Sequence, residues 1–393
     1  MTENSIVNIA PLSFPADIIS KISPELSLQR YLSTSIRPNL RSFEEFRDVH
    51  IEKDKISHYA QSLGSSGNVT DPNNEILGCN VLKSGETVIV TSITGGVVED
   101  METVSEFEES ILEISNEDDD TKRKTISHYA SVFPSVLIES GRNKHFPSDE
   151  EIVIAQKLHS NILHSGLISK QALKVSCGVR SVDVDGSISI VYPDESDTEN
   201  KDLFSNISNK KKWSYVLYAK IAVFGRNGPV FDLCWNSLIY ALRSTKLPRV
   251  FVDERASDLK MTVRTRGKSL TVREAYEVLS DPYRFLPLNI SSSDISYASN
   301  FGIINLDPEA QLITETEGEN MDITEPSSVL LADIDTEIEE KNVRSTISII
   351  SNGKGDFKSF TVVGGNVKIT SDIIKSAIKL SKERSLDLSK KEV

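Results

Sequence analysis

The strongest constraint on the fold comes from residues 213–248, WSYVLYAKIAVFGRNGPVFDLCWNSLIYALRSTKLP. Side chains of a strand alternate between its two faces, and apolar side chains here recur at every second position. These positions are Tyr215, Leu217, Ala219, Ile221 and Val223. Arg226-Asn227-Gly228 follows and tolerates positive φ, so the sequence predicts a strand, a hairpin turn and a short second strand.

A helix is predicted directly after this turn. Asp232 is a candidate N-cap, and apolar residues then recur at spacings of three and four residues along one stripe. The stripe consists of Trp235, Leu238, Ile239 and Leu242, and Pro248 lies just beyond the helix. A strand followed by a packing helix indicates layers of helix on sheet.

A second hairpin is predicted at residues 78–96, GCNVLKSGETVIVTSITGG. Lys83-Ser84-Gly85 supplies the turn, and ETVIVTSI is a nearly continuous apolar run, which is typical of a buried strand. Upstream, residues 36–47 read IRPNLRSFEEFR, and residues 331–340 read LADIDTEIEE.

These segments, in this order and at these distances, resemble the RNase PH family. The family opens on an Arg, an Asp-Gly-Arg and a Glu-x-Arg, and Asn39-Leu40 stands here in place of Asp-Gly. The matching positions are Arg37, Arg41, Glu45 and Arg47, then Gly78, Gly85 and Thr87 in the hairpin, where Cys79 replaces a Ser. Asp333 and the acids after it resemble the second signature of the family.

The resemblance extends to one branch of the family, the non-catalytic ring subunits of the eukaryotic RNA exosome. It covers nearly the whole chain, residues 15–386, through words such as ISPELSLQRYL, GPVFDLCWNSLIYAL, DERASDL and STISII. It implies an α+β, RNase PH-like fold (ribosomal protein S5 domain 2-like), with βαβα layers in two halves.

The expected organisation has four parts. They are an N-terminal extension at 1–30, a first RNase PH-like half at 31–250, a connecting basic segment at 251–284 and a second half at 285–393. Acidic insertions are expected near 99–124 and 193–211, and a further insertion near 307–328. Their Ser, Thr and Asn content favours solvated loops over specific docking sites.

Charge and composition narrow the class of protein. A net charge of −14 argues against tight nucleic-acid binding by the chain as a whole, although the acidic insertions carry much of it. No run of eighteen apolar residues and no secretion signal is visible, so we expect a soluble protein that is not secreted. Cys79, Cys177 and Cys234 are scattered, which favours buried reduced thiols over disulfides or a metal site.

The resemblance also implies what the chain cannot do. Active members attack RNA with inorganic phosphate and need a carboxylate beside a divalent metal, so the loss of one charge is decisive. In this sequence that carboxylate position falls at about Ser345, and residues 343–347 contain no acid. We therefore predict no catalytic residues and no cofactor.

The acids from Asp333 to Glu339 allow two interpretations, a metal site and a solvated strand end. Asp333, Asp335, Glu337 and Glu339 alternate, so an extended chain would place them on one face, and carboxylate oxygens suit magnesium. A solvated strand end and turn is favoured instead, so no metal ligand is predicted. His159 and His164 lie on a predicted helix near residues 147–164, where they are expected to be surface or satisfied core groups.

Two basic features are candidates for contacts. The loop at 140–145 precedes a helix, and in related ring subunits the corresponding region faces a channel, so Arg142 and Lys144 are candidate RNA phosphate contacts; the alternative is a solvated loop. Lys260, Arg264, Arg266 and Lys268 would share one face of a strand. A contact with an acidic subunit or a solvated face is favoured there over RNA, because no aromatic residues interleave.

The function implied is that of a catalytically inactive structural subunit of the exosome core ring. It would support 3′→5′ RNA degradation and processing, in rRNA maturation, mRNA turnover and RNA surveillance, by threading RNA to a nuclease subunit. Implied partners are other RNase PH-like ring subunits, S1/KH cap subunits, RNA in the channel and hydrolytic exoribonucleases. No contact with a membrane is implied. The implied location is the nucleus and nucleolus, and also the cytoplasm. Two alternatives stay open: a phosphate-dependent 3′→5′ exoribonuclease active in a heterodimer, and an RNA-binding module.

Overall fold

The structure is a computed structural model. It describes residues 15–53, 76–100, 128–139, 147–182, 188–194, 212–253, 258–261, 272–275, 278–307, 328–365 and 367–391. The chain forms two compact units, each discontinuous in sequence. The first comprises residues 1–48, 226–232 and 298–390, and the second comprises 49–225, 233–297 and 391–393. This division follows contacts in space, and the four-part organisation expected from the sequence stays a prediction.

The second unit contains a five-stranded sheet in the order β1-β2-β3-β9-β5. Its strands are β1 (Val49–Lys53), β2 (Gly78–Ser84), β3 (Thr87–Asp100), β9 (Lys212–Phe224) and β5 (Phe133–Glu139). The predicted hairpin of β2 and β3 is confirmed, with Gly85 at a φ of 59° in the turn. β9 pairs antiparallel with β3 and parallel with β5.

Helix α7 (Phe231–Ser244) packs on this sheet through Ser237, whose hydroxyl lies 2.8 Å from Thr91 Oγ1 of β3. Every residue from Leu233 to Leu242 is buried, so the single apolar stripe predicted for this helix was too narrow. Trp235 Nε1 donates to the Ser296 carbonyl at 2.9 Å on another side of the helix. A helix that is covered all round needs apolar or satisfied side chains on every face.

The hairpin predicted after β9 is wrong. Residues 225–230 form no strand that could pair with β9. They lead directly into α7. Gly225 and Gly228, with φ of 62° and 71°, provide the turn. Asp232 lies within the first turn of the helix, so it is not the N-cap.

Helix α5 (Asp149–Ser165) begins with a capping box, in which Ser148 Oγ accepts from the Glu151 N–H and Glu151 reaches back to the Ser148 N–H. Glu151 Oε1 also accepts from the Ile138 N–H of β5 at 2.6 Å, which ties the helix to the sheet.

Smaller elements of this unit are β4 (Tyr129–Ala130), β6 (Ile168–Ser169) and the 3₁₀ turn Lys170–Leu173. A four-stranded sheet has the order β13-β10-β7-β8, from β13 (Val278–Pro287), β10 (Lys246–Asp253), β7 (Gly178–Val182) and β8 (Ile188–Val191), and β11 (Asp258–Met261) pairs with β12 (Val272–Ala275).

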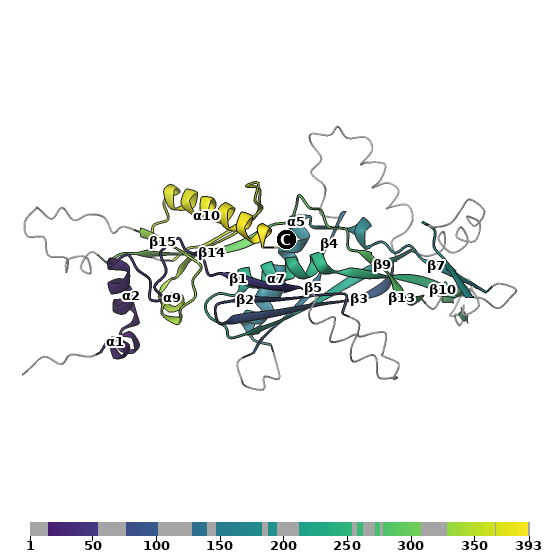
Figure 1. Ribbon diagram of the computed structural model, residues 1–393, viewed down its shortest axis with the longest axis horizontal. Coiled ribbons are helices and arrows are strands. Elements are labelled where there is room, and N and C mark those ends of the chain that lie inside the picture. The colour runs from purple at the N-terminus through teal and green to yellow at the C-terminus, as the bar shows by residue number, and fades with distance from the viewer. Residues whose placement is uncertain are drawn as a thin grey trace, which may run out of the picture. The chain divides into compact units, whose positions relative to one another are not determined.

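The first unit is built on a four-stranded sheet in the order β15-β14-β16-β17. Its strands are β15 (Ser328–Ala332), β14 (Tyr297–Asn305), β16 (Ser345–Ser351) and β17 (Phe357–Val363). Its helices are α1 (Ala16–Ile22), α2 (Pro24–Ser33), α9 (Glu337–Asn342) and α10 (Ser371–Lys390). Helix α10 contacts β15 and β16 and runs beside β15 in Figure 1.

Two apolar clusters show that both faces of this sheet are covered. Phe301 and Ile303 of β14 pack with Ala377 of α10 on one face. Ile304 of β14 packs with Leu28 and Leu32 of α2 on the other, next to α9. Successive strand residues point to opposite faces, so one strand supplies both clusters. The predicted α+β class and RNase PH-like fold agree with this architecture.

Candidate functional site

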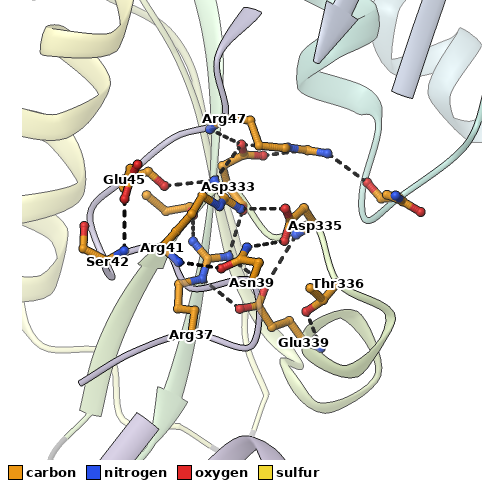
Figure 2. A network of polar contacts seen from close by, with 12 residues as sticks. Arg37, Asn39, Arg41, Ser42, Glu45, Arg47, Asp333, Asp335, Thr336 and Glu339 are labelled. Atoms are coloured by element: carbon orange, nitrogen blue, oxygen red, sulfur yellow. Dashed lines mark hydrogen bonds and ion pairs between the residues drawn. The ribbon is translucent and has the colours of Figure 1, made fainter. Parts of the chain in front are cut away.

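Two segments far apart in sequence meet within the first unit. The loop between α2 and β1, residues 37–47, lies against residues 332–340, which run from the end of β15 into α9 (Figure 2). These are the two segments that resemble the opening pattern and the second signature of the RNase PH family. Their charged side chains therefore form the candidate site.

Arg37 and Glu339 form a buried, bidentate ion pair at the base of this site. Arg37 Nε and Nη2 donate to the two carboxylate oxygens of Glu339 at 2.8 and 2.7 Å, and both side chains are 0% exposed. Arg37 also donates to the carbonyls of Ala332 and Asp333, so the guanidinium binds the backbone at the end of β15. Paired and hydrogen-bonded in this way, the two buried charges compensate each other.

Asp333 is the centre of the site, and two further arginines bind it. Arg47 donates from Nε and Nη2 at 2.9 and 2.7 Å, and its backbone N–H donates at 2.8 Å. Arg41 Nη1 lies 3.3 Å from Asp333 Oδ2, and its Nη2 donates to the Asp333 carbonyl at 2.9 Å. Asp333 has a φ of 52°, a conformation that residues with a Cβ rarely adopt, so these contacts hold a turn that is unfavourable on its own.

The electrostatics follow from this geometry. Burial alone would raise the pKa of Asp333, but the hydrogen bonds and charge of Arg47, with the charge of Arg41, outweigh it and hold that pKa below its ordinary value. Burial alone would likewise lower the pKa of Arg47, but Asp333 outweighs it and raises that pKa. Both groups are therefore charged near neutral pH.

Two further carboxylates, Asp335 and Glu340, are also paired with arginines. Asn39 Nδ2 donates to Asp335 Oδ1 at 2.7 Å, and Arg41 Nη2 lies 3.0 Å from Asp335 Oδ2. Arg226 Nη2 lies 2.6 Å from Glu340 Oε1. Among the described residues of this network, four arginines (Arg37, Arg41, Arg47 and Arg226) thus face four carboxylates (Asp333, Asp335, Glu339 and Glu340).

The interpretation of the acids at 333–340 as a solvated strand end is wrong for Asp333 and Glu339. Asp333 and Glu339 are buried, and the chain does not stay extended, because Thr336 caps α9 by accepting from the Glu339 N–H. The metal alternative also fits poorly, since guanidinium groups already occupy these carboxylates. In the part of the chain that the structure describes, no group of three or more His, Cys, Asp or Glu is arranged to hold a metal ion.

Ser345, where the resemblance places the catalytic carboxylate of active members, begins β16 and is fully buried. Its Oγ accepts a hydrogen bond from the Gly365 N–H at 2.9 Å, across the sheet edge near the end of β17. A carboxylate is larger than this hydroxyl, and Gly365 already lies close to Ser345 Oγ. The position serves packing and backbone hydrogen bonding in this chain.

The other candidate residues fall outside this site or outside the described residues. Arg142 and Lys144 lie among the residues that the structure does not describe, as do Arg264, Arg266 and Lys268. His159 Nδ1 lies 2.9 Å from the Val132 carbonyl and His164 Nδ1 lies 2.7 Å from the Ser160 carbonyl, so both histidines are satisfied as predicted. Burial raises the pKa of Cys177 to about 12, which leaves that thiol unreactive.

Comparisons with known proteins show similarity to the RNase PH family and to exosome subunits. Residues 45–193 match the family model described as RNase PH, 3′ exoribonuclease family, domain 1. The chain is 26% identical over 276 residues to the exosome complex component rrp43 of Schizosaccharomyces pombe, a match that covers 70% of this chain and 76% of that protein. The sequence words quoted above resemble the same fungal protein, ribosomal RNA-processing protein forty-three.

Solved structures with the same fold include two archaeal exosomes. One is the Archaeoglobus fulgidus exosome with RNA bound to the active site, which matches with a TM-score of 0.52 and 13% identity over 95% of this chain and 99% of that one. An archaeal exosome core matches with a TM-score of 0.50 and 14% identity over 96% and 99%. The chain therefore has an RNase PH-like fold over nearly its whole described length. No helix among the described residues is long and apolar enough to span a membrane.

Proposed function

We propose that this chain, which carries an RNase PH-type domain, is a structural subunit of the core ring of an RNA exosome and performs no nuclease chemistry of its own. The sequence likeness to an exosome component and the fold shared with archaeal exosome cores support the assembly.

The observation that supports inactivity is the environment of Ser345. A phosphorolytic site needs a carboxylate where charge develops in the transition state, and a neutral serine cannot supply it. Here the hydroxyl is buried and already bound to the Gly365 N–H, so it is not available to a reacting phosphate either. The arginines of the opening pattern are likewise bound by carboxylates, which neutralise the charge that an incoming phosphate would need.

The remaining elements of the proposal concern partners and place. The partners are the other RNase PH-like ring subunits, S1/KH cap subunits, RNA in the channel and hydrolytic exoribonucleases that receive it. The complex acts in rRNA maturation, mRNA turnover and RNA surveillance, in the nucleus, the nucleolus and the cytoplasm. Arg142 and Lys144 are the proposed phosphate contacts in the channel.

Nuclease activity provides the direct test. The purified chain, incubated with single-stranded RNA, magnesium and inorganic phosphate, should release no nucleoside diphosphates, while a phosphorolytic enzyme of the same family serves as positive control. The assay is repeated with each co-expressed ring subunit. Phosphate-dependent shortening by the chain alone, or activity of a heterodimer that survives replacement of the partner's own catalytic carboxylate, would favour the exoribonuclease alternative.

A further inference from the structure

Two exposed aromatic side chains lie next to each other on the five-stranded sheet. Phe133 of β5 and Tyr218 of β9 are cross-strand neighbours, and their ring centroids lie 5.7 Å apart with 34° between the ring planes. Each of these two residues is 51% exposed. The ring of His159, from α5, lies 5.4 Å from that of Phe133 at an angle of 31°. We call these three joined rings the aromatic platform.

The platform lies on the face of the sheet that α7 does not cover. Tyr218 pairs with Thr94 of β3, whereas α7 contacts Thr91, three residues earlier and therefore on the opposite face. The two exposed rings thus lie outside the core that the sheet forms with α7. His159 is held in place, because its Nδ1 lies 2.9 Å from the Val132 carbonyl. A platform that is already ordered loses little conformational entropy when a ligand binds.

Lysines lie on both sides of the platform along β9. Lys220 is exposed two residues after Tyr218 and therefore shares its face. Lys174, also exposed, forms an isolated antiparallel bridge with Ser214, four residues before Tyr218, so it shares this face as well. At about 3.3 Å per residue, the backbones of the two lysines lie roughly 7 and 13 Å from that of Tyr218. Among the described side chains of β5 and β9 on this face, the one acid is Glu139, at the far end of β5.

We propose that the aromatic platform, with Lys174 and Lys220, binds single-stranded RNA. Unpaired bases stack on the rings of Phe133 and Tyr218, and the two ammonium groups neutralise phosphates on either side of the stacked bases. Stacking does not distinguish one base from another, so the site has little sequence preference. This inference goes beyond the proposed function, which assigns RNA contacts to a different segment of the chain, at 140–145.

The charges of this face favour RNA over another subunit as the occupant. Exposed aromatic rings also occur at protein interfaces, but the centres of such interfaces are depleted in lysine. Here an exposed lysine lies on each side of the rings, and Glu139 lies six residues from Phe133 along β5. Two cations around an aromatic surface complement a chain of bases and phosphates.

The test compares Tyr218→Thr with Phe224→Thr. Phe224 is a matched control, because it is 44% exposed on the same strand and face but lies beside Glu139, away from the platform. Threonine suits a strand, so both variants keep the β propensity of the position. The purified chain is titrated with a labelled single-stranded polyadenylate oligonucleotide at low salt, since a chain with a net charge of −14 binds RNA weakly. The dissociation constant should rise at least about fivefold for Tyr218→Thr and stay near the wild-type value for Phe224→Thr.

Two further variants separate the ring from the charge. Tyr218→Phe keeps an aromatic ring and should bind like the wild type. Lys220→Gln should reduce the salt slope of binding by about 0.7, the change expected for one phosphate of a single strand. If Tyr218→Thr melts several degrees below the wild type, these two variants decide, and an unchanged salt slope in Lys220→Gln refutes the site.

The other outcomes are equally definite. Equal losses of affinity in Tyr218→Thr and Phe224→Thr refute the platform, as does equal affinity of the wild type for duplex RNA, because stacking needs unpaired bases. Unchanged RNA affinity with impaired assembly in Tyr218→Thr would assign this face to a neighbouring subunit instead. If the wild-type chain joins no ring subunit, the proposed function fails, whereas the platform is still decided by the RNA titration of the isolated chain.

Discussion

Replacing Arg37 should lower the free energy of unfolding more than is usual for a residue in a loop. It is fully buried, and its loss leaves the Glu339 carboxylate buried without its partner. Arg37→Met should therefore lower the free energy of unfolding by about 3–5 kcal/mol, measured by chemical denaturation. The double variant Arg37→Met with Glu339→Leu should recover part of this loss, because both buried charges are then absent.

An exposed ion pair supplies the control for this prediction. Lys341 and Glu337 lie 2.6 Å apart on α9, but both side chains are mostly exposed. Lys341→Met should leave the denaturation midpoint within error of the wild type, since solvent screens such pairs. Equal losses in Arg37→Met and Lys341→Met would contradict the view that the buried network holds the loop in place.

The stability of the fold should depend on pH through Asp333. Its pKa is lower in the folded chain than in the unfolded chain, so its contribution to stability is present above the ordinary pKa of an aspartate, about 3.9, and is lost as pH falls through the lower folded value. Asp333→Asn should be less stable than the wild type at pH 7, because Arg47 loses its charged partner. Below about pH 4 the stability difference between the two proteins should shrink, as measured by denaturation midpoints across pH 2–7. A difference that stays constant with pH would show that the charge of Asp333 does not matter.

At the scale of elements, a buried carboxylate helps to attach α5 to the sheet. Glu151 accepts from the Ser148 N–H in the capping box and from the Ile138 N–H of β5, and it is 1% exposed. Glu151→Ala would leave these donors without their acceptor, so the free energy of unfolding should fall by about 2 kcal/mol. Glu150→Ala, at an exposed position one residue earlier, is the matched control and should change it by less than about 0.5 kcal/mol. Similar losses in both variants would count against this role of Glu151.

Strand β14 shows how buried polar residues can conceal an element. Residues 297–305, YASNFGIIN, form this strand, although their sequence carries no alternating pattern. Ser299 and Asn300 are buried in this strand, which lies inside the sheet between β15 and β16. Covered on both faces, the strand shows no clean alternation of polar and apolar residues, so a search for period two misses it.

Helix α10 extends beyond its apolar stripe for a related reason. The apolar stripe fades after residue 381, yet the helix continues to Lys390. Its last part packs through small hydroxyl side chains, because Ser381 Oγ and Ser385 Oγ lie 2.8 and 3.1 Å from Ser351 Oγ of β16. Buried serines that satisfy one another read as polar in sequence but act as part of the core.

At the scale of the whole molecule, RNA contacts should depend on assembly. We predict that Arg142 and Lys144 each neutralise about one phosphate in the complete ring, so the double alanine variant should reduce the salt slope of RNA binding by up to about two, regardless of sequence. The measurement is RNA protection and binding by the reconstituted complex at several salt concentrations. The isolated chain, with its net charge of −14, should bind RNA weakly with or without the substitutions.

The result distinguishes a channel position of the loop at 140–145 from a position outside the channel. An unchanged salt dependence and an unchanged protected length would place Arg142 and Lys144 outside the channel, as ordinary solvated residues. Weaker binding confined to some sequences would also contradict the prediction, because phosphate contacts do not read bases.

The sequence alone determined the features that depend on neighbouring residues. Alternating apolar residues identified β9, the turn at Gly85 identified the hairpin of β2 and β3, and the segment at 147–164 closely anticipated α5. These patterns are local, because they follow from the period of a strand or helix and from the conformational freedom of glycine. The ordered motifs also indicated the RNase PH-like fold.

Only the tertiary structure decided how distant segments meet. Arg37 and Glu339 are 302 positions apart, and neither residue shows by its own surroundings in sequence that it is buried. The same holds for the parallel pairing of β9 with β5 and for the exposure of Leu40. Hydrophobic periods predict which face of an element is buried, but the partner of a charge and the neighbour of a strand depend on long-range packing. For this reason the acidic segment at 333–340 looked solvated in sequence and is the centre of a neutralised, buried network in the folded chain.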